Sequence, residues 1–446
     1  MIFDGNPVTA VNPGQYVSGR PCGYCHSDES AIYGFSFTSL TVEHYQLLLE
    51  RGLRRSGTFM YKPDLLNSCC PQYAIRLEAS KFKPSKEHRQ ALHRFNRHIL
   101  GEEYEKEVLK FESSRSPKKS KNEFSLSKAI HRAEHHSLLI RGTRPKHKFE
   151  VKLVEPDGTD EKFLLYKHYQ ITCHKDKEED VTRHGFERFL CGGRHRPFEL
   201  GYNQYDENLY RKQKPIKRLG LWHQMYYVDD ELIAMAVLDF LPDTISSVYF
   251  MYREDYSHFS LGKVSACREN LLAFEEGRKY YYLGLYIYSC QKMKYKASFS
   301  PSELLDPELY KFFSYTKFQT EFEKSEYVSF KDNHLTRLSS DSIRRHHELD
   351  RTSESDLDNY EEKSLFQVNM PGIISRKEAA RQVDISLIRM TAFGRVIPFS
   401  KLQEIYRKNN YSIAPLEDVF LELVAVLGKD VVIESIVRIA NGPDEL

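Results

Sequence analysis

The sequence predicts an α+β protein, and the stretch from about residue 219 to 290 carries most of that prediction. The segment LGLWHQMYYVDDELIAMAVLDFLP alternates apolar and polar residues on both sides of an Asp-Asp turn, which is typical of two paired strands, and TISSVYFMYR continues as a third strand. A stretch with helical spacing follows, and then KYYYLGLYIYS, a further strand. A helix that connects two strands of one sheet must lie across that sheet.

The predicted helix runs from about 261 to 278, and Ser260 is placed to cap its start. The apolar residues near one of its faces are Leu261, Val264, Leu271, Leu272 and Phe274. This order of a three-stranded meander, a helix and a returning strand occurs in the GNAT acyltransferase fold, although other folds share it. Before the meander, FEVKLVEPDG predicts a strand with a turn and FLLYKHYQITCHK predicts a helix.

Length and composition limit the possible classes of protein. A chain of 446 residues predicts two structural units, each with its own core. The formal charge is only +2, from 65 basic and 63 acidic residues, so a nucleic acid would have to be held by local basic surface. We expect neither a secretory signal nor a membrane span, because the start lacks the signal pattern and acids interrupt the longest apolar runs.

The chain divides into five predicted regions. Residues 113–148 carry ten Lys or Arg against two Glu, which predicts either an RNA-facing arm or a solvated surface segment, and residues 348–362 carry seven acids against one Arg. The tail is expected to be mostly helical, with a capping pattern at Ser375 and Glu378. The regions are a metal or cysteine-cluster domain (1–111), a basic linker (112–148), a GNAT-like transferase domain (149–330), an acidic insertion (331–366) and a helical C-terminal segment (367–446).

Four of the eight cysteines form a candidate metal site. Cys22 and Cys25 are two residues apart around a glycine, a familiar half-site, whereas Cys69 and Cys70 are adjacent, which is less regular. The alternative is a pair of buried thiols beside an empty dithiol, and His26 could replace one thiolate. Four thiolates with no vacant position would make a closed site, either structural zinc or an iron-sulfur cluster, and therefore not the catalytic centre. Without a visible secretory signal, eight cysteines favour reduced thiols in the cytosol or the nucleus.

Two segments carry a resemblance to a known family. The first follows Cys69 and Cys70, and the second ends in YYYLGLYIYSCQKMKYKASFSP. The matching residues outside the four-cysteine cluster include Pro71, Arg76, Phe82, Pro84, Ser85, Lys86, Arg89, Asp239, Ser246, Tyr249, Asp255, Ser260, Gly262, Tyr282, Gly284, Tyr286, Cys290, Lys292, Met293, Tyr295 and Lys296. With these residues the chain resembles the arginyl-tRNA-protein transferases and their bacterial leucyl-transferring relatives, over about residues 15–100 and 165–310.

The resemblance implies an aminoacyltransferase of the N-degron pathway, and the cysteine usage leads us to expect it in the cytoplasm, with the nucleus as the alternative compartment. Such an enzyme moves arginine from arginyl-tRNA to the α-amine of proteins that begin with Asp, Glu or oxidised Cys, which marks them for ubiquitin-dependent degradation. The implied partners are arginyl-tRNA and protein or peptide acceptors with acidic N-termini, with no membrane. Two alternatives stay open: a non-catalytic, metal-dependent RNA-binding or sensor protein, and a CoA-dependent N-acyltransferase.

The expected donor site lies at the start of the helix at 261. HFSLGKVSA holds one glycine, Gly262, whereas a CoA pyrophosphate is cradled by several backbone amides of a glycine-bearing loop. We therefore expect Ser260, Gly262 and Lys263 to meet a tRNA phosphate, with no CoA. An aminoacyl ester is already activated, so the reaction needs alignment with the amine and no ATP.

Four residues are candidates for catalysis. An N-terminal amine has an unperturbed pKa of about 8, so a modest base suffices, and His223 on a predicted strand is the first candidate, against a purely structural role. The resemblance adds Asp239, Asp255 and Tyr282. The leucyl-transferring relatives have aspartates at matching positions, so these acids do not explain a preference for arginine, which stays unassigned.

An acidic acceptor requires fixed cations. The family-matched choices are Arg76, Lys86, Lys292 and Lys296, and the same charges would also serve the tRNA backbone. Bidentate geometry makes Arg76 the preferred carboxylate clamp. Ser246 belongs to the same substrate set, and Tyr249, Tyr282 and Tyr286 are expected either to stack on the terminal adenine or to belong to the core.

Overall fold

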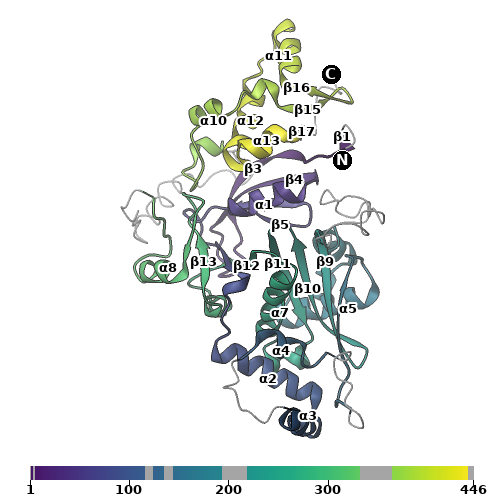
Figure 1. Cartoon of the computed structure of the whole chain (residues 1–446). Coiled ribbons are helices and arrows are strands. Elements are labelled where there is room, and N and C mark those ends of the chain that lie inside the picture. The colour runs from purple at the N-terminus through teal and green to yellow at the C-terminus, as the bar shows by residue number, and fades with distance from the viewer. Residues whose placement is uncertain are drawn as a thin grey trace.

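The computed structural model describes residues 2–3, 6–115, 124–134, 144–192, 218–331 and 364–439. Two sheets, each with helices against it, form the two ends of the molecule (Figure 1). The predicted α+β class is confirmed. No helix within the described ranges combines the length and apolar character that a membrane span requires.

The larger sheet has eight strands in the order β14-β13-β7-β12-β11-β10-β9-β8. Their bounds are β7 Tyr73–Glu78, β8 Phe149–Val154, β9 Gly220–Val228, β10 Glu231–Phe240, β11 Thr244–Tyr252, β12 Tyr280–Tyr286, β13 Ser302–Leu305 and β14 Phe312–Ser314. The predicted meander is β9-β10-β11, and its first turn has positive φ at both Asp229 and Asp230, as a tight hairpin requires. The strand pairs of this sheet are antiparallel except β11 with β12.

Helices cover both faces of the larger sheet. One face packs on α7 (Leu261–Glu275), α2 (Lys86–Leu100) and α4 (Leu126–His131), and the other on α5 (Asp160–Tyr169) and α6 (Arg183–Leu190). Alternation along the strands separates two cores: Tyr281 belongs to the α7 side and Tyr282 to the α5 side. The remaining helices and turns near this sheet are α3 (Glu102–Arg115), α8 (Tyr315–Phe322), η1 (Ala79–Lys81), η3 (Gln170–His174), η4 (Glu178–Asp180), η6 (Glu254–Phe259) and η7 (Lys294–Ser298).

The second sheet joins the N-terminal and C-terminal parts of the chain. Its seven strands follow the order β16-β15-β17-β3-β4-β6-β5, and β17 pairs with β3. The bounds are β3 Ala10–Arg20, β4 Ser30–Ser39, β5 Arg54–Ser56, β6 Phe59–Pro63, β15 Arg389–Ala392, β16 Arg395–Pro398 and β17 Ile436–Arg438, beside a small β1 (Ile2–Phe3) and β2 (Asn6–Pro7) pair. Its helices are α1 (Val42–Glu50), α10 (Arg376–Gln382), α11 (Phe399–Lys408), α12 (Ala414–Leu427) and α13 (Lys429–Glu434), with the short turns η8 (Leu365–Gln367) and η9 (Ile385–Leu387).

The prediction of a mostly helical tail needs a correction. The tail also supplies β15, β16 and β17 to the second sheet. These strands have three or four residues, too few for a periodic signal, and β17 pairs with a strand at the other end of the sequence. The helix that was predicted near the end is confirmed as α12.

The predicted start of α7 is right in position and wrong in its cap. Ser260 precedes the helix with a left-handed φ of 57°, and its hydroxyl makes no capping bond; it accepts a hydrogen bond from Arg94 at 3.3 Å. Phe274, which was expected on the apolar face, is 55% exposed. Because α7 is buried nearly all round its middle, apolar spacing could not define its inner face.

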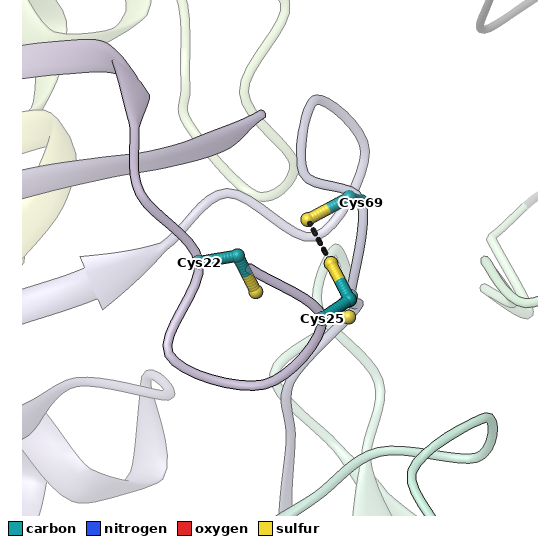
Figure 2. Close-up of side chains that lie close together, drawn as sticks. Cys22, Cys25 and Cys69 are labelled. Carbon is teal, nitrogen blue, oxygen red and sulfur yellow. Dashed lines mark hydrogen bonds between the residues drawn. The ribbon is translucent and has the colours of Figure 1, made fainter. Parts of the chain in front are cut away.

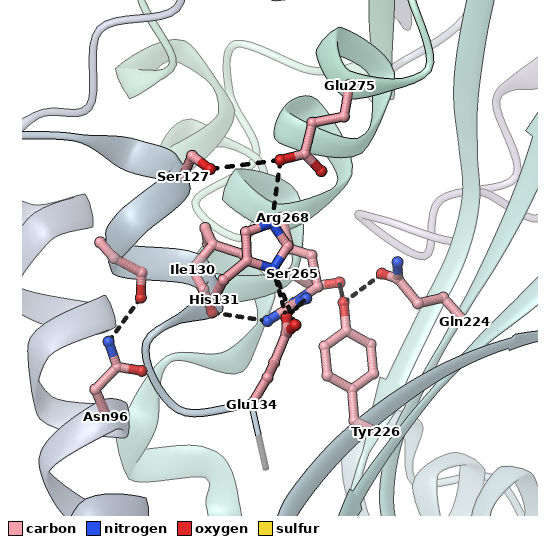
Figure 3. A network of polar contacts seen from close by, with 11 residues as sticks. Asn96, Ser127, Ile130, His131, Glu134, Gln224, Tyr226, Ser265, Arg268 and Glu275 are labelled. Carbon is pink, nitrogen blue, oxygen red and sulfur yellow. Dashed lines mark hydrogen bonds and ion pairs between the residues drawn. The ribbon is translucent and has the colours of Figure 1, made fainter. Parts of the chain in front are cut away.

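The region predicted as a basic linker includes α4, which is anchored on α7 by a polar network (Figure 3). Arg268 and Glu134 form a buried ion pair at 2.5 Å, and the His131 ring lies 2.9 Å from Glu134 and 3.0 Å from Glu275. Most of the predicted acidic insertion, residues 332–363, lies outside the described residues. The larger sheet also crosses the first predicted boundary, because β7 lies between β12 and β13. The division of the chain into five folding units remains a prediction.

Candidate functional site

β11 and β12 separate soon after they begin to run side by side. Their pairing ends at Ser246 and Tyr282. Gly284 follows with a φ of +85°, and a Cβ added there would lie 3.6 Å from the carbonyl oxygen of Ser247. Ligands of α/β sheets bind beyond the carboxyl ends of parallel strands. We call this place, bounded by Ser247 and Gly284, the strand opening.

The amine of Lys296 lies in the strand opening. It donates a hydrogen bond to the Leu285 carbonyl at 2.8 Å, and it is 3.7 Å from the position that a Cβ of Gly284 would take. Burial, followed by the charge of Arg54, lowers the pKa of Lys296 to about 8. Arg54 itself reaches the opening from β5 and donates to the Gly284 carbonyl at 3.3 Å. Burial and the nearby Arg54 therefore both favour the neutral form of this amine.

Arg76, the predicted carboxylate clamp, lies on β7 beside Tyr282, its cross-strand partner on β12. Its guanidinium carbon is 3.7 Å from the ring centroid of Tyr280 and 3.5 Å from that of Phe312. Its Nε donates to Glu303 at 3.0 Å, and another nitrogen donates to the Tyr282 hydroxyl at 3.4 Å. The Arg76 guanidinium is thus held rigidly, and it already has the Glu303 carboxylate as a partner.

A pocket of about 560 Å³ opens beside Arg76. Its lining contains both acidic and basic side chains. Burial raises the pKa of Glu50, which indicates that the lining is partly desolvated. The lining residues are Gln46, Glu50, Arg76, Asp243, Lys279, Tyr280, Tyr310, Lys311, Phe312 and Phe313. The pocket can therefore accept a charged group next to aromatic rings.

The predicted tyrosine set does not form one surface. Tyr249 and Tyr282 belong to the core on the α5 side, whereas Tyr286 belongs to the core on the α7 side. The Tyr249 hydroxyl donates to Gln170 at 2.7 Å, and the Tyr286 hydroxyl lies 3.0 Å from that of Tyr315. Burial raises the pKa of Tyr282, whose hydroxyl accepts from Arg76. Ser246 is buried at the last paired position of β11.

His223, the first candidate base, is fully buried on β9, and β10 separates β9 from β11. One ring nitrogen lies 3.0 Å from the Leu190 carbonyl, and burial lowers the pKa of His223 to about 4. Asp239 is also fully buried, and both of its oxygens are bonded to Arg55, one of them also to Tyr45. These surroundings give both residues a structural role, and their assignment to catalysis stays a prediction.

Asp255 lies in η6, directly after β11, where it is exposed and paired with Arg253 at 2.8 Å. The predicted tRNA residues lie nearby in the chain, at the start of α7. Lys263 forms an ion pair with Glu87 at 2.6 Å, and the space around Gly262 is open. The starts of α7 and α2 therefore meet here.

The start of α2 is also tied to the segment that carries Lys296. His88 is buried there, and its ring lies 3.0 Å from the Ser298 hydroxyl. Burial lowers the pKa of His88 to about 4. Lys86 and Lys292 are exposed, so both are available to a polyanion.

The four predicted metal ligands come together. The sulfurs of Cys22, Cys25, Cys69 and Cys70 all lie within 4.8 Å of one another (Figure 2). Four thiolates at a tetrahedral zinc ion would be about 3.8 Å apart, so the sulfurs present fit a metal with little movement. His26 is not in this group and has a left-handed φ of 64° in the ligand loop.

The electrostatics of the cluster also fit a cation. Burial, together with the neighbouring thiols, raises the pKa of Cys69 to about 12 and raises that of Cys70 further. A metal ion would relieve this repulsion. Cys22 and Cys70 pack on Ile287, just after β12, with Cys290 at the edge of the same group. The cluster thus supports the segment between β12 and Lys296.

Sequence reasoning missed three residues of this region: Arg54, His88 and Glu269. Glu269 interrupts the buried middle of α7, which is a usable signal, since a buried carboxylate requires partners. No signal distinguishes Arg54 or His88 from ordinary surface residues in the sequence.

Two models of one family match the chain. The N-terminal model of the arginine-tRNA-protein transferases matches residues 20–90, and the C-terminal model matches residues 161–306. The strand opening, Arg76 and the four cysteines lie within these matches.

Curated proteins give the same result. Arginyl-tRNA–protein transferase 1 of Dictyostelium discoideum is 26% identical over 66% of this chain and 82% of its own length. The protein of the same name from Saccharomyces cerevisiae is 32% identical over 64% of this chain and 58% of its own. An aspartate/glutamate leucyltransferase of Campylobacter jejuni is 33% identical over 35% of this chain and 57% of its own.

Among solved structures, the C-terminal domain of a putative lysylphosphatidylglycerol synthetase from Agrobacterium fabrum is similar at 12% identity, over 65% of this chain and 64% of that one. The TM-score is 0.27, too low to support any conclusion.

Proposed function

The chain belongs to the arginine-tRNA-protein transferase family, and from this premise we propose that its acceptors are proteins that begin with Asp, Glu or oxidised Cys. Its activity is that of the family, the transfer of arginine from arginyl-tRNA to a protein N-terminus. One observation carries the assignment to a single site: β7, from the N-terminal match, lies hydrogen-bonded beside β12, from the C-terminal match, with Arg76 opposite Tyr282.

We also propose that the unit built on the larger sheet is a GNAT-like acyltransferase domain. The antiparallel β9-β10-β11 meander, the crossover through α7 and the parallel β12 that separates from β11 support this assignment. In such a domain the acyl carbonyl would lie at the strand opening, near Lys296. The donor is then held by its tRNA, with Lys86 and Lys292 exposed toward its phosphates and the start of α7 close by.

The acidic first residue of the acceptor is proposed to bind Arg76. This arginine is stacked between two rings and opens on the 560 Å³ pocket with Lys279 and Lys311. An acceptor carboxylate would replace Glu303 as its partner, since the Glu303 side chain is 35% exposed and can turn into solvent. An alanine at the same position would leave the Arg76–Glu303 pair in place and gain nothing.

Cys22, Cys25, Cys69 and Cys70 are proposed to hold zinc or an iron-sulfur cluster. With four sulfurs and no vacant position, the group when bound would supply structural support or redox sensitivity. Its contribution to the reaction runs through the packing of Cys22 and Cys70 on Ile287, which holds the segment leading to Lys296. The donor ester is already activated, so we propose a reaction with neither ATP nor CoA. The reduced thiols that such a site requires suit the cytoplasm and the nucleus.

The test is a direct transfer assay. The full chain is mixed with arginyl-tRNA and with peptides that differ only in Asp or Ala at the first residue, and added arginine is detected by mass. Arginine on the Asp peptide alone is expected. Equal labelling of both peptides would overturn the acceptor proposal, and tRNA binding without transfer would favour a non-catalytic RNA-binding protein. Saturable binding of acetyl-CoA would instead favour a CoA-dependent acyltransferase.

A further inference from the structure

A chain of buried polar groups lies behind the strand opening, on the α7 side of the sheet. Glu269 is 1% exposed in the middle of α7. One of its oxygens accepts from the Ser265 hydroxyl at 2.5 Å, and the other accepts from the Tyr281 hydroxyl at 2.7 Å. Tyr281 is the neighbour of Tyr282 in β12, at the point where the pairing with β11 ends.

This series of hydrogen-bonded polar groups continues away from the strand opening, into the polar network of Figure 3. The Tyr226 hydroxyl lies 3.0 Å from that of Ser265 and donates to Gln224 at 2.7 Å. Every polar atom named here is in contact with another, so the Glu269 carboxylate is fixed in place. Burial raises its pKa, while hydrogen bonds from Ser265 and Tyr281 oppose that rise.

Lys296 is the titratable group on the side of these polar groups that faces the strand opening. The Lys296 residue as a whole is half-buried, and its amine donates a hydrogen bond to the Leu285 carbonyl at 2.8 Å. The charged or titratable groups that act on it come from three elements: Arg54 lowers its pKa, and Cys290 and Glu269 raise it. Glu269 is therefore the carboxylate that favours the charged form of this amine.

We propose that Lys296 is a catalytic residue that carries a proton from the attacking α-amine of the acceptor to the leaving ribose oxygen of the tRNA, and that Glu269 is the positioning residue that tunes it. The proposal rests on the proposed transfer activity. It assigns Lys296 a role that neither a carboxylate clamp nor a phosphate contact provides.

The reaction balances around this one amine. The nitrogen lone pair of the acceptor attacks the ester carbonyl and forms the new C–N bond. The bond from that carbon to the ribose oxygen breaks, and its electron pair stays on the oxygen. The acceptor nitrogen loses one proton and the ribose oxygen gains one, so neutral Lys296 takes up the first and returns the second. No oxidant, reductant or further reactant is consumed.

Lys296→Arg is the central test, because arginine keeps the positive charge and cannot give up its proton at working pH. Single-turnover transfer from arginyl-tRNA to the Asp peptide is expected to fall about 100-fold or more. Binding of arginyl-tRNA, measured separately, is expected to change less than about threefold. Lys294→Arg, at an exposed position of the same turn, is the matched control and keeps the transfer rate.

The pH profile tests Glu269. Single-turnover transfer to the Asp peptide is followed across pH, and because the acceptor amine is the same in every assay, a shift of the inflection between wild type and variant belongs to the enzyme. Glu269→Gln removes a charge that raises the pKa of Lys296, so the inflection moves to lower pH. Tyr281→Phe, which removes one bond to Glu269, moves it in the same direction and covers the case in which Glu269→Gln fails to fold.

Transfer by Lys296→Arg within about tenfold of the wild-type rate would overturn the proton role, since general acid–base catalysis contributes more than that. An unmoved inflection in a folded Glu269→Gln or Tyr281→Phe variant would overturn the positioning role. If the wild-type chain adds no arginine to the Asp peptide, the proposed function itself fails, and that result is distinct from both.

Discussion

Arg55 on β5 and Asp239 on β10 form a two-point ion pair that joins the two sheets. The Nε–Oδ2 distance is 2.7 Å and the other nitrogen–oxygen distance is 2.5 Å, with both side chains almost fully buried. Its neighbour Arg54 reaches the strand opening from the same strand. One three-residue strand of the second sheet thus connects the core of the first sheet to its candidate site.

Removing one partner of this pair should destabilise the protein strongly. Asp239→Asn replaces the carboxylate of a buried ion pair with a neutral amide, which is expected to lower the free energy of unfolding by about 3–5 kcal/mol. Urea denaturation measures the loss. Glu107→Gln, which removes an exposed pair with Lys110, should cost less than about 0.5 kcal/mol. Equal effects of the two substitutions would contradict the role of Asp239 in joining the sheets.

The cysteine cluster should bind a metal through all four sulfurs. Cys22→Ser is expected to abolish stoichiometric metal in anaerobically purified protein, because a closed site with three thiolates loses much of its affinity. Metal analysis and visible absorption measure the content and separate zinc from iron-sulfur. Cys173→Ser, outside the cluster, is the control and should keep the metal. Full metal content in Cys22→Ser would exclude this site.

Arg76 and Glu303 should affect acceptor choice in opposite directions. Arg76→Lys loses the two-ring stacking and the planar donor set, so KM for the Asp peptide should rise about tenfold or more, with little change in KM for arginyl-tRNA. Glu303→Gln removes the competing carboxylate and should lower KM for the Asp peptide. Steady-state kinetics measure both constants, and parallel changes in the two KM values would contradict a clamp.

The exposed lysines should contribute to tRNA affinity in a salt-dependent way. Lys86→Gln and Lys292→Gln are each expected to weaken binding at low salt and to reduce the dependence of log K on log salt by about one. Filter binding over a range of salt concentrations measures this slope. Lys401→Gln, an exposed lysine on α11, should leave it unchanged. Unchanged slopes for Lys86→Gln and Lys292→Gln would mean that the tRNA binds to another surface.

His223 should affect acid stability more than catalysis. Its pKa in the folded protein is about 4, below the unfolded value of about 6.5, so the unfolded chain binds the extra proton between these values. Stability is therefore complete above pH 6.5 and falls as the pH drops toward 4, by up to about 3 kcal/mol from this residue. Urea denaturation at pH 7 and pH 5 should show a smaller difference in His223→Gln.

The same His223→Gln variant tests the predicted base. Because His223 is bonded to Leu190 and lies a strand away from β11, transfer at pH 7.5 should stay within about tenfold of wild type. A greater loss in a stable variant would restore His223 as a catalytic candidate. His184→Gln, an exposed histidine on α6, is the control for both measurements.

Parts of the molecule with local signals or specific chemistry were predictable from the sequence. Alternation predicted β9, β10 and β11, apolar spacing predicted α7, and the four cysteines were recognisable as one candidate metal site. The family resemblance rested on residues that lie within the matched segments.

Which of these residues act together depends on the three-dimensional fold. β7 enters the larger sheet from far away in the sequence, which brings Arg76 to Tyr282, and the tail returns as β17 beside β3. Such pairings depend on long-range hydrogen bonds that leave no periodic trace in a strand of three to six residues. The ion pair between Asp239 and Arg55 and the desolvation of the Lys296 amine also depend on neighbours from other strands. The sequence therefore does not reveal them.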